Sequence, residues 1–160
     1  MSVQSIRPQL TEQDIERLMR GETPEQRASV AHRVCRRIAL DVLSDLPRAI
    51  ALKLAQDIEA VAIPVLQDSP VFTDEDLIEL VLAVTAAKQA AIANRETLSI
   101  TLTEVISEHG AVEAVRAASR NEGAEYSDKA FDDTLRRFGQ DEIVQTGLIK
   151  REFIPTHIAE

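Results

Sequence analysis

The chain has 160 residues, of which 44% are hydrophobic and 3% aromatic, and its net charge is −9 at neutral pH. This length fits one domain with a core of Ala, Leu, Ile and Val, while five Gly and six Pro are too few for a strand-rich fold. One cysteine excludes an internal disulfide, and no apolar run approaches the roughly 18 residues of a membrane span. Because the N-terminus also lacks the apolar core of a signal peptide, we expect a cytoplasmic protein.

The first half of the chain predicts three helices after a loose lead-in over residues 1–9. Hydrophobic residues recurring at spacings of three and four predict helices over about residues 12–20 and 24–44. A third helix is predicted to begin at Leu46-Pro47, and its broad apolar stripe indicates a central place in the fold. Pro64 should kink or end this helix, because a proline inside a helix removes a hydrogen bond.

The second half predicts a series of shorter helices, marked by capping residues at their starts and glycines at their ends. They are expected over residues 74–84, 86–94, 98–108, 111–120, 128–138 and 142–150. The whole chain therefore predicts an all-α fold of about eight to ten helices, arranged as antiparallel pairs.

One helix start recurs three times along the chain. Thr11, Thr73 and Ser127 are hydroxyl residues suited to the N-cap, where the side-chain oxygen accepts from a free backbone N–H. Each follows a large hydrophobic residue that pairs with another five residues further on, forming a hydrophobic staple. The caps lie 62 and 54 residues apart. These intervals exceed the roughly 35 to 45 residues of one helix pair, so each should contain more than two helices.

A second repeated feature is an Arg-Glu pair near a helix end. The segment 92–98 aligns with the segment 148–154 at an offset of 56 residues, which places Arg95 and Arg151 at equivalent positions. The first interpretation is that both arginines complement the carbonyl end of a helix. The alternative is a shared ligand site, so Arg95 and Arg151 are candidate interaction residues.

The acidic residues are distributed unevenly. Residues 1–60 contain nine basic and nine acidic residues, whereas residues 61–160 contain nine basic and eighteen acidic ones. The net negative charge disfavours nucleic acid as a partner. Arg33, Arg36 and Arg37 nevertheless form a local basic cluster that keeps this alternative open.

Sequence motifs for catalysis and metal binding are absent. The chain has no P-loop, no dinucleotide-binding fingerprint, no His-Glu-x-x-His and no cysteine pair, and its three histidines lie far apart in sequence. We therefore predict no catalytic residue, no cofactor and no metal, and a non-enzymatic protein.

The segment 62–98, with its Pro70-Val71-Phe72-Thr73-Asp74-Glu75-Asp76-Leu77 element and the Ala-rich run at 87–93, resembles a known family. It is similar to HEAT-like helical-repeat proteins found mostly in alphaproteobacteria and classified as a domain of unknown function. The resemblance spans roughly residues 10–155. It implies a HEAT-like fold, an α-solenoid-type array of antiparallel helix pairs, and a cytoplasmic bacterial protein.

These features predict a protein–protein interaction module, an adaptor or regulatory scaffold, whose acidic half suits a basic or helical partner. The alternatives are a nucleic-acid-binding repeat that uses the arginine cluster at 33–37, and a small-molecule binder or enzyme with a pocket between helices. We expect one domain over residues 10–160 that forms the N-terminal part of a longer array. A homodimer through its C-terminal face is compatible with each function.

Overall fold

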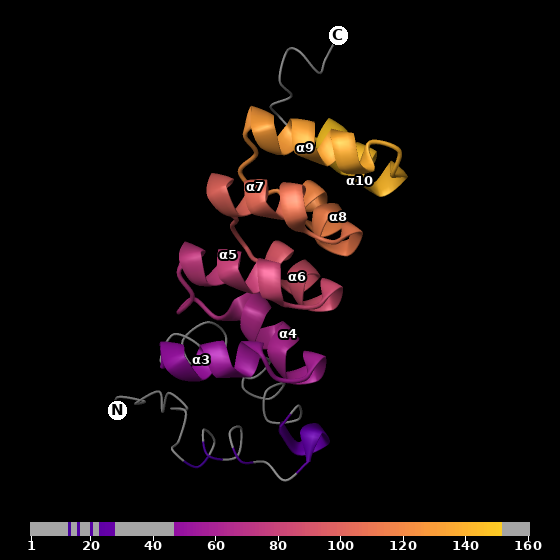
Figure 1. Ribbon diagram of the computed structural model, residues 1–160. Coiled ribbons are helices and arrows are strands. Elements are labelled where there is room, and N and C mark those ends of the chain that lie inside the picture. The colour runs from indigo at the N-terminus through magenta and orange to yellow at the C-terminus, as the bar shows by residue number, and fades with distance from the viewer. Residues whose placement is uncertain (1–12, 14–15, 17–19, 21–22, 28–46, 152–160) are drawn as a thin grey trace, which may run out of the picture. The chain divides into compact units, whose positions relative to one another are not determined.

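The computed structural model describes residues 13, 16, 20, 23–27 and 47–151 (Figure 1). All regular elements among these residues are helices, and one isolated parallel bridge pairs Leu98 with Ala124. The described part is therefore all-α, as predicted. The chain divides into two compact units, Met1–Val71 and Phe72–Glu160, and the expectation of one domain over residues 10–160 stays a prediction.

The described part of the first unit contains a packed helix pair, α3 (Arg48–Ala55) and α4 (Glu59–Asp68). A bidentate ion pair fixes an earlier segment to the turn between them, because both Arg27 Nε and Arg27 Nη2 donate to Asp57 carboxylate oxygens at 3.1 Å. Most of the helices predicted over 12–20 and 24–44 lie outside the described residues.

The single long helix predicted from Leu46-Pro47 is wrong, because the chain breaks it at residues 56–58. The Asp57 side chain accepts from the backbone N–H of Ile58 at 2.7 Å, which gives the backbone a partner outside a helix. Pro64 does not end its helix, which was one of the two effects expected of it. This proline lies inside α4, and the helix continues through it to Asp68.

The described part of the second unit, residues 72–151, contains six short helices, whose bounds fall within two residues of those predicted. They are α5 (Asp74–Ala83), α6 (Ala86–Ala93), α7 (Ile100–His109), α8 (Val112–Arg120), α9 (Asp128–Phe138) and α10 (Glu142–Ile149). Four of these helices, α5 to α8, lie between the caps Thr73 and Ser127, so the prediction of more than two helices in this interval is confirmed.

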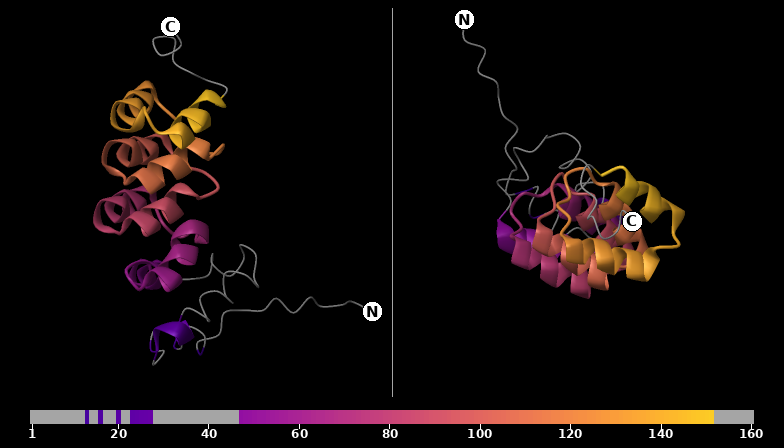
Figure 2. Two further views of the ribbon diagram at one scale, coloured as in Figure 1. Left: turned by 90° about the vertical axis from the view of Figure 1, so that its right-hand side faces the viewer. Right: turned by 90° about the horizontal axis from the view of Figure 1, so that it is seen from above.

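The six helices alternate between two layers. In one layer, which we call the odd layer, α7 packs against both α5 and α9; in the other, the even layer, α8 packs against both α6 and α10. Figure 2 shows the two layers as adjacent columns of helices. Fully buried side chains come from both layers, including Phe131 and Ile106 from the odd layer and Ile92 and Val115 from the even layer. Burial of each such side chain stabilises the fold by about 1.5–3 kcal/mol.

Local capping chemistry explains where the odd-layer helices begin. At α5, Thr73 Oγ1 accepts from Asp76 N at 3.3 Å, and the Asp76 carboxylate accepts from Thr73 N at 3.0 Å, forming a complete capping box. At α9, Ser127 Oγ accepts from Ala130 N at 3.2 Å. Ser99 caps α7 in the same way, through Leu102 N. The expected cap Thr11 lies outside the described residues.

Backbone segments also approach closely between consecutive helix pairs. Leu98 N donates to Gly123 O and Glu125 N donates to Leu98 O, each at 3.0 Å, so the α6–α7 and α8–α9 loops run side by side. A Cβ on Gly123 would lie 1.9 Å from Glu96 O. Only glycine leaves room for this approach, which helps to fix the distance between successive pairs.

Candidate functional site

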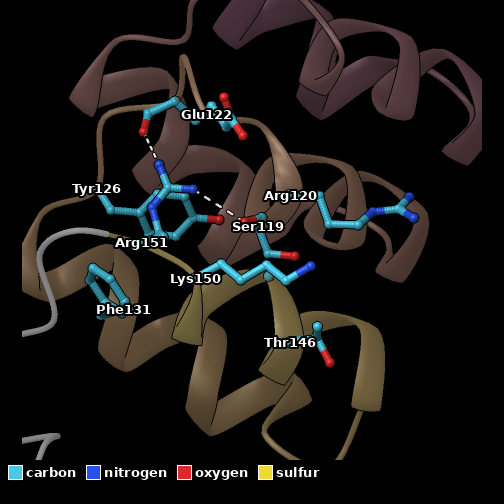
Figure 3. A pocket seen from close by; sticks show the side chains of 10 residues that line it. Ser119, Arg120, Glu122, Tyr126, Phe131, Thr146, Lys150 and Arg151 are labelled. Atoms are coloured by element: carbon cyan, nitrogen blue, oxygen red, sulfur yellow. Dashed lines mark hydrogen bonds between the residues drawn. The ribbon is translucent and has the colours of Figure 1, made fainter.

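A hollow of about 780 Å³ opens in the second unit, where α8 and α10 end (Figure 3). Its walls come from the C-terminal end of α8, the α8–α9 loop, the start of α9 and the last turn of α10. The polar lining residues are Ser119, Arg120, Glu122, Thr146, Lys150 and Arg151.

Arg151 forms a fixed wall of the hollow. Its Nη1 donates to Ser119 O and Asn121 O, both at 3.2 Å, and its Nη2 donates to Ala124 O. The guanidinium also lies over the Tyr126 ring, with 4.3 Å between Cζ and the ring centroid, as Figure 3 shows. Burial lowers the pKa of Arg151 from its usual value. This arginine therefore completes the carbonyl end of α8.

The Tyr126 ring that contacts Arg151 is itself packed against a second aromatic ring. Tyr126 precedes the cap of α9 and Phe131 lies five residues further on, and their ring centroids are 5.2 Å apart with planes tilted by 59°. This pair is the hydrophobic staple of the third helix start. Burial raises the pKa of the Tyr126 phenol to about 12, so the ring stays neutral at physiological pH.

Two further basic side chains line the hollow, and neither has a carboxylate partner among the residues that the structure describes. Arg120 donates from Nε to Arg116 O at 3.3 Å, and Lys150 is exposed. In Figure 3 both side chains extend toward the same side of the hollow, and Glu122 lies apart from them. The hollow therefore presents more positive than negative charge.

The odd layer is chemically different from this hollow. Helices α5, α7 and α9 contain nine acidic and three basic residues, whereas α6, α8 and α10 contain two acidic and three basic ones. The asymmetry is greatest at α5, which has four acidic residues and no basic one. The excess negative charge of the second unit is thus concentrated in one layer.

Part of the odd-layer charge is neutralised where α7 meets α9. Lys129 Nζ lies 2.7 Å from a carboxylate oxygen of Glu108 and 2.7 Å from one of Asp133. Hydrogen bonding to Lys129 lowers the pKa of both Glu108 and Asp133, and the carboxylates in turn raise the pKa of Lys129. Arg136 pairs with Asp133 at 2.5 Å. The exposed acidic residues Asp74, Glu75 and Glu79 of α5 add to the negative charge of the same layer.

Residues 61–160 match a protein family described as an uncharacterised protein conserved in bacteria, DUF2336. The chain belongs to the DUF2336 family. No curated protein and no solved structure matches it. The DUF2336 match includes α5 to α10, so it covers both the acidic odd layer and every residue that lines the hollow.

The sequence-predicted candidate residues fall into two groups. Arg33, Arg36 and Arg37 lie outside the described residues and outside the DUF2336 match. Arg95 and Arg151 are both half-buried and follow α6 and α10. Only Arg151 lines the hollow, so the structure does not bring these two arginines into one site.

Sequence reasoning missed residues that join successive helix pairs of the DUF2336 region. Asn121 Nδ2 donates to Ala93 O at 2.9 Å and to Arg95 O at 2.7 Å, and so completes the carbonyl end of α6. Buried Gln89 donates to Val81 O and accepts from Ala111 N. The only available signal was an amide side chain in a turn or on a small-residue helix, which does not identify a distant partner.

The described residues offer neither a metal-binding cluster nor a membrane-spanning helix. Within them, no three His, Cys, Asp or Glu side chains are grouped so that they could hold a metal ion. In the same part of the chain, no helix combines the length and apolar character needed to cross a bilayer.

Proposed function

We propose that this DUF2336 protein is a non-enzymatic interaction module, an adaptor or regulatory scaffold that binds another protein through its odd layer. We further propose that its helix pairs form a HEAT-like, α-solenoid-type array that acts in the cytoplasm. The packing supports the array, because each helix contacts the neighbouring helices of its own layer. Arrays of this kind offer extended surfaces for partners.

The observation that carries this proposal is the acidic bias of α5, α7 and α9. On α5, Glu75, Glu79 and Leu82 follow the spacing of one helix face and are all exposed, Leu82 by 59%. Such a face offers two carboxylates beside an apolar contact. A basic amphipathic helix presents the complementary pattern, with cations beside apolar residues, so it is the partner class that fits.

A paired comparison of charge variants tests the proposal. One variant carries Glu75→Gln and Glu79→Gln on the odd layer, and its matched control carries Glu113→Gln and Glu142→Gln on the even layer. All four residues are exposed, and each variant loses two negative charges. Binding of a Lys/Arg-rich amphipathic helical peptide is measured by calorimetry at low and high salt, and the same proteins serve as bait in a bacterial lysate.

We expect the odd-layer variant to bind the peptide several-fold more weakly than the wild type, and the even-layer variant to bind almost as well. Salt should weaken wild-type binding, because screening reduces attraction between exposed charges. A lysate partner should be retained by the even-layer variant and lost by the odd-layer one. Equal loss in both variants, or binding that is independent of salt, would contradict the proposal.

A further inference from the structure

The hollow at the ends of α8 and α10 has a chemistry that the proposed protein interaction does not use. Its volume of about 780 Å³ lies within the roughly 300–1,000 Å³ of small-molecule sites. Three of its polar lining residues are basic, Arg120, Lys150 and Arg151, and one is acidic, Glu122. The hollow is therefore a basic concave surface on a chain whose net charge is negative, −9.

The carbonyl end of a helix ordinarily repels anions, because it carries a partial negative charge. Here Arg151 donates to Ser119 O, Asn121 O and Ala124 O, so the end of α8 is neutralised by a full positive charge. The Arg151 guanidinium therefore already donates to three carbonyls within the protein. Arg120 and Lys150 remain, in the described part of the chain, without a carboxylate to neutralise them.

The rest of the lining is short or apolar. Ala124 and Gly147 are small and buried, and Tyr126 and Phe131 contribute the staple rings. A Cβ on Gly147 would lie 2.6 Å from Ser119 Oγ, so glycine here lets α10 approach α8. The hollow therefore combines the exposed cations Arg120 and Lys150 with buried apolar residues.

We propose that this hollow binds a small organic anion, a carboxylate or phosphate monoester attached to an apolar group. The anionic group lies against Arg120 and Lys150, and the apolar group lies toward Ala124, Gly147 and Tyr126. The planar guanidinium of Arg120 provides paired donors for two anion oxygens, and the Lys150 ammonium provides a mobile point charge. Of the residues that line the site, only the uncharged Phe131 belongs to the odd layer.

Calorimetry with defined probes tests the inference. Phenyl phosphate and benzoate carry the proposed anion and an apolar ring, phenol is the uncharged analogue, and inorganic phosphate is the anion alone. The variants are Arg120→Gln and Lys150→Gln. The control is Lys53→Gln, which removes one positive charge from an exposed position in α3, outside the hollow. Thermal unfolding verifies that each variant stays folded.

We expect phenyl phosphate or benzoate to bind the wild type and Lys53→Gln equally, and each hollow variant about tenfold more weakly, because a charge-assisted hydrogen bond is lost. Phenol should bind much more weakly than either anion. The inference is overturned if neither organic anion binds the wild type, if Lys53→Gln weakens binding as much as Lys150→Gln, or if inorganic phosphate binds as tightly as phenyl phosphate.

Discussion

Two contacts connect the helix pair α7–α8 to the pair α9–α10, and they differ in kind. In the odd layer, α7 and α9 are joined by polar side chains. Thr134 Oγ1 donates to Ser107 Oγ at 3.0 Å in a fully buried position, and Arg137 donates to Ser107 O at 2.7 Å and to Gly110 O at 2.9 Å. Lys129 adds the ion pair to Glu108.

In the even layer, α8 and α10 are joined mainly by a close backbone approach. A Cβ on Gly147 would lie 2.8 Å from both the carbonyl carbon and the oxygen of Ser119. Arg151 then completes the end of α8, and Arg116 pairs with Asp141 at 2.6 Å. The α7–α9 interface therefore depends on individual hydrogen bonds, which can be removed one at a time. The α8–α10 interface depends mainly on the lack of a side chain at Gly147.

The largest expected effect is that of Gly147→Ala. The added methyl group meets backbone atoms of Ser119, which no change of rotamer can move aside, so α10 must shift away from α8. We expect a loss of about 2–3 kcal/mol in the free energy of unfolding, measured by urea denaturation, even though alanine favours helices.

The neighbouring change Thr146→Ala is the control for this prediction. Thr146 is exposed on α10, so its replacement should change the free energy of unfolding by no more than about 0.5 kcal/mol. If Gly147→Ala were as well tolerated as Thr146→Ala, the α8–α10 contact would not depend on close approach.

A smaller effect is expected for Arg151→Met, which keeps the aliphatic stem and removes the donors. Two carbonyls at the end of α8 and one in the α8–α9 loop then lose their partner, and we expect a loss of about 2 kcal/mol, measured by urea denaturation. Arg151→Lys should recover only part of it, because an ammonium cannot reproduce the planar fork. Full recovery by lysine would show that charge alone is needed.

Thr134→Val tests the contact between α7 and α9. We expect it to lower the free energy of unfolding by about 1 kcal/mol. The change conserves shape but leaves buried Ser107 Oγ without its donor. A second variant, Thr134→Val with Ser107→Ala, removes both partners. Chemical denaturation of the four proteins in this cycle should show that the double variant loses less than the sum of the single losses. Simple additivity would contradict direct coupling.

The smallest expected effect concerns pH and the odd layer alone. Lys129 and Arg136 hold the pKa of Asp133 below its usual value. A carboxyl whose pKa is lowered by folding stabilises the native state above its unfolded pKa of about 4 and loses this contribution as pH falls through the folded pKa. The free energy of unfolding should therefore fall in this acid range. Asp133→Asn should flatten the curve there, and parallel curves for the two proteins would refute the assignment.

The sequence predicted residues 72–151 more accurately than residues 47–71 because the signals in the later segment are local. Thr73 with Asp76, the glycines after α7 and α9, and the staple of Tyr126 and Phe131 each act within a few residues. Such chemistry is readable without knowledge of the fold. The break at Asp57 was missed because the apolar stripe continues across it and the side-chain bond to Ile58 N competes with the helix.

The candidate site was less predictable because it depends on distant contacts. Arg151 was identified from its repeated position, but its partners lie 27 to 32 residues away in sequence. Arg120 and Lys150 carry no motif, and only the fold places them around one hollow. The acidic excess was visible as a count over residues 61–160, but its concentration on α5, α7 and α9 follows from the alternation of layers.

The completed carbonyl ends of the even layer have a consequence for how the unit comes apart. The end of α6 is completed by Asn121, which follows α8, and the end of α8 is completed by Arg151, which follows α10. Both α6 and α8 thus receive hydrogen bonds at their carbonyl ends from a residue of the helix pair that follows. Fraying of α10 withdraws support from α8, and loss of α8 withdraws it from α6. Amide hydrogen exchange should therefore be fastest in α10 and slower in α8, with openings that spread toward the N-terminal side of the unit.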